Sequence, residues 1–167
     1  MSEYNIACLD VYYYDDHARA CCVLFESDGQ QKRISEYIAN TNHVAKYIPG
    51  QFYKRELPCL IKVLDQVKEK IDIIIIDSHV WLGQDKKGLG VYLYNEYGDK
   101  TPVIGVAKSE FKDSTQSIQV YRGKSNKPLF VSSIGIDLQW AADFVKKMKG
   151  DYRIPDVLKY VDSLTRE

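Results

Sequence analysis

The chain has 167 residues and equal numbers of acidic and basic side chains, 23 of each, so its formal net charge is zero. This length predicts a single domain over residues 1–167 with a sizeable core. Zero net charge argues against tight, non-specific binding along a nucleic-acid duplex but leaves room for a small footprint. The four cysteines lack C-x-x-C spacing and lie in apolar segments, which predicts buried thiols in a reducing compartment. Without a signal-peptide pattern or a membrane-length apolar run, we expect a cytoplasmic protein with no membrane partner.

The first forty residues predict an antiparallel meander. Strands are expected over residues 4–14, 18–27 and 30–38, and Asp-Gly at positions 28–29 is a strong hairpin signal between the second and the third. A polar connection over 40–52 follows, and it includes a turn with an exposed aromatic side chain.

From residue 56 onward the pattern alternates between helix and strand. Apolar residues recur at helical spacing over 56–70, with Pro58 expected in the first turn. The apolar runs at 71–77 and 101–107 are typical of strands covered on both faces. The remaining expected elements are strands at 117–122 and 128–133 and helices near 89–97, 138–148 and 155–164. This order predicts an α/β domain, a mixed sheet with helices on both faces.

Three carboxylates stand at the ends of these elements. Asp10 lies in the first strand, Asp77 closes the apolar run at 71–77, and Glu56 stands where the next helix is expected to begin. An ionised carboxylate beside so much apolar surface is costly unless a cation or strong donors hold it. Oxygen ligands from separate elements suit Mg²⁺, so these three residues are candidate metal ligands.

Five blocks in order along the chain carry a resemblance. They are Leu9-Asp-Val-Tyr-Tyr13, Tyr47-Ile-Pro-Gly-Gln-Phe-Tyr-Lys-Arg-Glu56, Ile75-Ile-Asp-Ser-His79, Pro102-Val-Ile-Gly-Val-Ala-Lys108 and Lys127-Pro-Leu-Phe-Val-Ser132. Together they resemble the endonuclease V family, repair nucleases with a ribonuclease H-like fold. The family shows a first strand, a Y-x-P-G…R-E block, a D-G-H-G strand end, a P-T-I-G-V-A-K strand and a late strand in this order.

The resemblance implies a divalent-metal-dependent endonuclease that hydrolyses phosphodiester bonds near deaminated bases, inosine in particular. Asp10, Glu56 and Asp77 would hold Mg²⁺ or Mn²⁺, and Lys108 would lie close to the scissile phosphate. The substrate would be DNA or RNA, single-stranded or carrying a lesion. The wedge that fills the gap left by an extruded base would correspond to Tyr47, Ile48 and Pro49.

The sequence departs from the family pattern in three places. D-G-H-G is replaced by Asp77-Ser-His-Val80, and side chains on Ser78 and Val80 are expected to crowd the base pocket beside His79. The basic H-P-R run that normally follows is absent. The histidine of the S-x-G-H-R block is missing after Ser133-Ile-Gly135, where Asp137 is a candidate fourth ligand, with helix N-capping as its alternative.

Simpler interpretations remain open for each residue. Asp10 could pair with a lysine, Lys108 could be solvated, and Glu56 could favour a helix N-terminus through the macrodipole. His79 could line the cleft or be a satisfied polar group. At the level of the whole chain, the alternative is a relative of the family that binds nucleic acid or protein without cutting. A further alternative is a nuclease for a branched or undamaged strand.

Overall fold

The computed structural model describes residues 3–28, 30–42, 46, 48–49, 52–83, 86–98, 100–111 and 116–167. In these ranges the strands are β1 (Asn5–Tyr13), β2 (His17–Glu26), β3 (Arg33–Asn42), β4 (Ile73–Ile76), β5 (Trp81–Gly83), β6 (Lys86–Lys87), β7 (Val103–Ala107), β8 (Ile118–Val120) and β9 (Leu129–Ile134). The helices are α1 (Phe52–Leu64), α2 (Leu89–Glu96), α3 (Leu138–Lys147) and α4 (Asp156–Thr165). No helix among these residues combines the length and apolar character needed to cross a bilayer.

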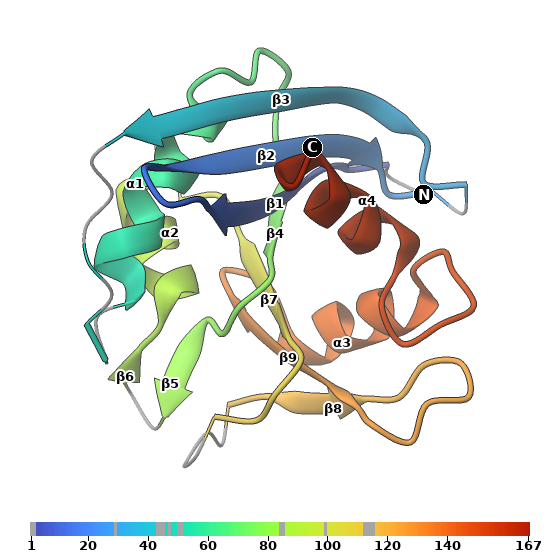
Figure 1. Cartoon of the computed structure of the whole chain (residues 1–167). Coiled ribbons are helices and arrows are strands. Elements are labelled where there is room, and N and C mark those ends of the chain that lie inside the picture. Colours follow the sequence, from blue (N-terminus) through green and yellow to red (C-terminus); the bar gives the residue numbers. More distant parts are fainter. Residues whose placement is uncertain are drawn as a thin grey trace.

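Seven strands form one mixed sheet in the order β3-β2-β1-β4-β7-β9-β8, and β5 and β6 form a small hairpin of their own (Figure 1). β1, β4 and β7 are parallel neighbours, whereas β2, β3, β8 and β9 join by antiparallel pairing. The predicted mixed sheet and opening meander are therefore confirmed. The parallel centre matters for the site, because its carboxyl ends meet at one edge of the sheet.

Helices cover both faces of this sheet, as predicted. Alternate residues of β1 show the division: Ile6 and Cys8 pack in the core beneath α3 and α4, whereas Ala7 and Leu9 pack beneath α1 and α2. This is the period-two alternation of a strand buried on both sides. All four cysteines are buried and free, as their apolar neighbours indicated.

The largest boundary error concerns α1, which runs from residue 52 to 64 and not from 56 to 70. Its early start is supported by a tertiary contact, because the ring of Tyr53 stacks on Tyr92 of α2 at 3.7 Å between centroids. Pro58 consequently lies inside the helix and not in its first turn. Pro58 and Lys54 are both exposed, so water can reach the Lys54 carbonyl that loses its usual donor.

Candidate active site

The register of the parallel strands brings Asp10, Asp77 and Lys108 to one edge of the sheet. Leu9 pairs with Ile76, so the next residues along β1 and β4, Asp10 and Asp77, are neighbours on strands about 4.8 Å apart. Both side chains fall on the α4 face, since each lies two residues beyond a side chain packed there. Lys108 follows the last residue of β7, the next parallel strand.

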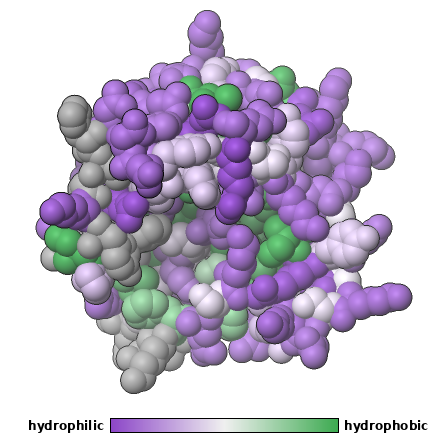
Figure 2. Space-filling view, in the orientation of Figure 1, coloured by the Kyte–Doolittle hydropathy of each residue, from purple (hydrophilic) through white to green (hydrophobic). Residues whose placement is uncertain are grey.

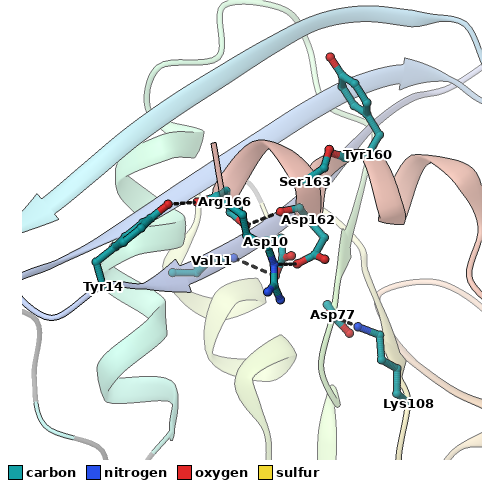
Figure 3. A network of polar contacts seen from close by, with 10 residues as sticks. Asp10, Val11, Tyr14, Asp77, Lys108, Tyr160, Asp162, Ser163 and Arg166 are labelled. Carbon is teal, nitrogen blue, oxygen red and sulfur yellow. Dashed lines mark hydrogen bonds and ion pairs between the residues drawn. The ribbon is translucent and has the colours of Figure 1, made fainter.

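A small cavity opens between this edge and α4. Its volume is about 110 Å³, and α4 contributes a further carboxylate, Asp162, to its wall. Figure 3 shows Asp10 and Asp162 close together, with Asp77 and Lys108 across the gap. The complete lining consists of Leu9, Asp10, Asp77, Lys108, Ile154, Leu158, Lys159, Val161 and Asp162.

Asp162 is the site residue that the sequence analysis missed. A signal for it exists in the amphipathic pattern of α4. Asp162 directly follows Val161 and lies four residues after Leu158, so a carboxylate occupies a position on the buried side of the helix. An ionisable side chain in an apolar stripe is costly unless it has a polar partner, and the partner of Asp162 is the Asp10 carboxyl.

The surroundings of Asp10 strongly disfavour its charged form. Burial, followed by a hydrogen bond with the Asp162 carboxyl and the negative charge of Asp77, raises the pKa of Asp10 to about 7. The Val11 N–H donates to Asp10 Oδ1 at 2.9 Å and acts in the opposite direction. A hydrogen bond between two carboxyl groups needs a proton between them, so Asp10 and Asp162 cannot both be ionised in this arrangement.

Glu56 reaches the same group of charges from α1. Only 8% of the residue is exposed, and burial together with the charges of Asp10 and Asp77 raises the pKa of Glu56 to about 8. Glu56 is the fifth residue of α1 and not the first, so its position gives little support to a macrodipole role, which is confined to the first turn. The fold thus brings Asp10, Glu56 and Asp77 within electrostatic range of one another.

Two cations pair with the outer carboxylates. Lys108 Nζ lies 3.2 Å from Asp77 Oδ2, and Arg166 Nε lies 3.2 Å from Asp162 Oδ1 (Figure 3). The Lys108 and Arg166 side chains are 50% and 57% exposed, so these pairs contribute little stability and can exchange partners readily.

The donor set fits a divalent cation. Among the residues that the structure describes, no three Asp, Glu, His or Cys side chains already converge as a ready-made ligand cluster. Carboxylates from four separate elements nevertheless face one small region, where burial first and their mutual repulsion second raise the pKa values of Asp10 and Glu56. A hard cation that prefers oxygen ligands would stabilise the ionised form of these carboxylates.

The expectation that Val80 crowds a base pocket is wrong. Its side chain is fully buried in the core beneath α2, where it packs so closely on Gly90 that a Cβ there would lie 2.6 Å from Val80 Cγ2. Its N–H donates to Ser132 Oγ at 2.9 Å. Ser78, by contrast, is only partly buried at the end of β4, so its side chain stays a candidate substrate contact.

His79 has a positioning role that the sequence left open. It is 9% exposed, and burial lowers its pKa, which favours the neutral ring. Nε2 lies 2.9 Å from the Ser109 carbonyl, so the proton belongs on Nε2 and the ring ties the segment after β4 to the segment after Lys108. Its Nδ1 is buried without a hydrogen-bond partner.

The candidate fourth ligand, Asp137, is a correction. It is the N-cap of α3, where its Oδ2 accepts a hydrogen bond from the Trp140 N–H at 2.9 Å. It lines a different pocket, together with Asp72 and Pro102, which precede β4 and β7. Asp77 lies at the opposite end of β4, so Asp137 cannot bind the same metal ion as Asp77.

The structure describes two of the three residues of the expected wedge. Tyr47 lies outside the described residues. Ile48 and Pro49 are exposed, with half of the Ile48 surface accessible, and Pro49 comes three residues before the start of the helix that carries Glu56. Their role as a wedge stays a prediction.

Gly105 of β7 allows the end of β4 to approach closely. A Cβ at this position would lie 2.4 Å from the Ser78 carbonyl oxygen and 2.9 Å from Ser132 Oγ. We expect Gly105→Ala to lower the free energy of unfolding by about 1–3 kcal/mol, because backbone must move to relieve the overlap. Urea unfolding measures this, and Gly98→Ala is the control, where a Cβ meets nothing within 4 Å although the φ of 45° adds some strain. Equal losses in the two variants would contradict the close-approach explanation.

Comparison with known proteins decides the family. The sequence model of Endonuclease V matches residues 2–124, which include Asp10, Glu56, Asp77 and Lys108. The chain belongs to the endonuclease V family. An Endonuclease V of Trichormus variabilis is 32% identical over 142 residues, which cover 71% of this chain and 62% of that protein. An Endonuclease V of Rippkaea orientalis is 27% identical over 186 residues, and that alignment covers 98% of this chain and 80% of the relative.

Solved structures agree on the fold. Endonuclease V of Ciona intestinalis, solved with a 24-mer DNA containing an inosine followed by a ribo-adenosine, aligns with a TM-score of 0.85 at 20% identity. That alignment covers 99% of this chain and 85% of the other. Endonuclease V of Streptomyces avermitilis aligns with a TM-score of 0.80 at 24% identity, covering 97% and 79% of the two chains. The ribonuclease H-like architecture expected from the sequence is thereby confirmed.

Two facts qualify what the family match covers. The chain spans about three fifths of the length of the Trichormus relative. Asp162 lies outside the matched residues 2–124, so its assignment to the site depends on the geometry of α4.

Proposed function

We propose that this chain is a divalent-metal-dependent endonuclease that hydrolyses phosphodiester bonds in DNA or RNA next to deaminated bases such as inosine. The observation that carries the proposal is the meeting of Asp10, Asp77, Lys108 and Asp162 around one cavity, with Glu56 in electrostatic range. Family membership supports the reaction class, and the inosine-containing DNA held by the Ciona protein supports the choice of lesion.

In this proposal Asp10, Glu56 and Asp77 hold Mg²⁺ or Mn²⁺, and Asp162 takes the place first considered for Asp137. When bound, such an ion supplies positive charge that acidifies an attacking water and stabilises the departing oxygen. Asp10 and Asp162, which share a hydrogen bond in this structure, would give up the shared proton as they become ligands.

The remaining roles belong to side chains around the cavity. Lys108 would leave Asp77 for a phosphate oxygen of the substrate, an exchange made easy by its half-exposed side chain. Ser78 lies at the end of β4 beside Asp77, and His79 holds that segment in place. Ile48 and Pro49, with Tyr47 before them, would meet the nucleotide whose base leaves the stack.

The test is cleavage by the purified chain of single strands and duplexes of DNA and RNA, each with one inosine or with adenosine at the same position. We expect cleavage with Mg²⁺ or Mn²⁺, none with EDTA, and a preference for inosine. Failure to cut any strand across both metals and pH 6–9 would reject catalysis. Binding of these strands without cleavage would instead support the non-catalytic alternative.

A further inference from the structure

The connection between α3 and α4 presents an exposed aromatic ring beside the cavity. Tyr152 is 67% exposed, more than any other exposed large hydrophobic side chain among the described residues. The Nζ atom of Lys159, which lines the cavity with Asp10 and Asp162, lies 4.6 Å from the centroid of this ring. Tyr152 therefore stands at the rim of the candidate active site.

The segment that carries Tyr152 is anchored by the two residues that follow it. The next residue, Arg153, donates through Nη2 to the carbonyl of Lys108, at 2.5 Å, and to that of Pro128, at 2.8 Å. Ile154 follows and lines the cavity itself. An aromatic ring held in place yet left in water costs free energy in the isolated protein, and it needs no further ordering before it meets a partner.

The charge around this ring suits one class of partner. Two exposed lysines, Lys108 and Lys159, line the cavity together with three half-buried carboxylates, Asp10, Asp77 and Asp162. A nucleic-acid strand presents phosphates to such lysines and flat bases to an exposed ring. Figure 2 shows a largely hydrophilic face hollowed near its middle, where hydrophobic side chains are visible.

We propose that Tyr152 and Lys159 form a clamp for the cleaved strand, in which Tyr152 stacks on a base flanking the scissile phosphate and Lys159 contacts a backbone phosphate. This inference rests on the proposed function and names residues that would set how tightly the substrate strand is held. Lys159 supports the ring from one side through its cation–π contact and leaves the rest of the ring free for stacking.

The test compares Tyr152→Ala, Tyr152→Phe and Lys159→Gln in the full chain. Binding of an inosine-containing single strand is followed by fluorescence anisotropy with Ca²⁺, and cleavage is followed with Mg²⁺. We expect Tyr152→Ala to raise Kd and KM by about 5- to 150-fold, the range of single base–aromatic stacks, with kcat changed less than about twofold. Tyr152→Phe should stay near wild type, and Lys159→Gln should lower the salt dependence of binding by about one phosphate contact.

Tyr121→Ala is the matched control, because Tyr121 is 50% exposed and its hydroxyl donates to Gln119, whereas the Tyr152 ring contacts the cavity-lining Lys159. Unchanged Kd and KM in Tyr152→Ala and Lys159→Gln, in a chain that cleaves normally, would overturn the clamp and leave the proposed function standing. Equal losses in Tyr152→Ala and Tyr152→Phe would also overturn it, because stacking does not need the hydroxyl. A wild-type chain that neither binds nor cuts any strand would remove both proposals.

Discussion

Asp10→Asn and Glu56→Gln are expected to abolish cleavage and, at the same time, to stabilise the metal-free protein. Loss of one carboxylate ligand removes several kcal/mol of charge stabilisation, which corresponds to a rate loss on the order of 10³-fold. The gain in stability comes from removing a carboxylate charge that is unfavourable when no metal is bound. In the metal-free fold these carboxylates are buried and repel one another, as the raised pKa values of Asp10 and Glu56 show.

Cleavage assays with Mg²⁺ and thermal unfolding in EDTA at pH 8.5 measure the two effects. The Tm should rise by several degrees, because about 1 kcal/mol shifts the Tm of a domain of this size by roughly 2–4 °C. Asp65→Asn is the control, since Asp65 is an exposed carboxylate just beyond α1 and should change neither quantity. If the site variants lose stability in EDTA, as after an ordinary core substitution, the carboxylates are satisfied without a cation and the metal assignment fails.

The metal-free protein is expected to lose stability as the pH rises from about 4 to about 8. The pKa of Asp10 moves from 3.8 to about 7 on folding and that of Glu56 from 4.5 to about 8. Between each pair of values the folded state binds more protons than the unfolded state, so the free energy of unfolding falls with rising pH. The contribution is complete below pH 4 and gone above pH 8.

Urea unfolding in EDTA at several pH values, on wild type and on Glu56→Gln, measures this effect because titrating groups that do not interact with Glu56 cancel in the difference. The two proteins should converge at pH 4, below the unfolded-state pKa of Glu56, and differ by on the order of a few kcal/mol at pH 8.5, where the variant is more stable. Saturating Mg²⁺ should restore wild-type stability at high pH, since a ligand that binds only the folded state stabilises it. A difference independent of pH would contradict the raised pKa of Glu56.

Local pattern in the sequence was sufficient for much of the fold. The apolar run that ends at Asp77 identified a strand buried on both faces, and Asp10 was recognised as a strand carboxylate. These inferences succeed because periodicity and strand burial are properties of contiguous residues. The five ordered blocks then identified the family, which the match over residues 2–124 confirmed.

Only the tertiary structure decided which carboxylates share a cavity. Asp137 and Asp162 both lie in or beside C-terminal helices, yet Asp137 caps α3 at one end of the central strands and Asp162 faces Asp10 at the other. The buried position of the Val80 side chain depends on its packing against Gly90. The early start of α1 depends on the stacking of Tyr53 on Tyr92. Each outcome depends on the spatial arrangement of elements distant in sequence, which local propensity and spacing do not specify.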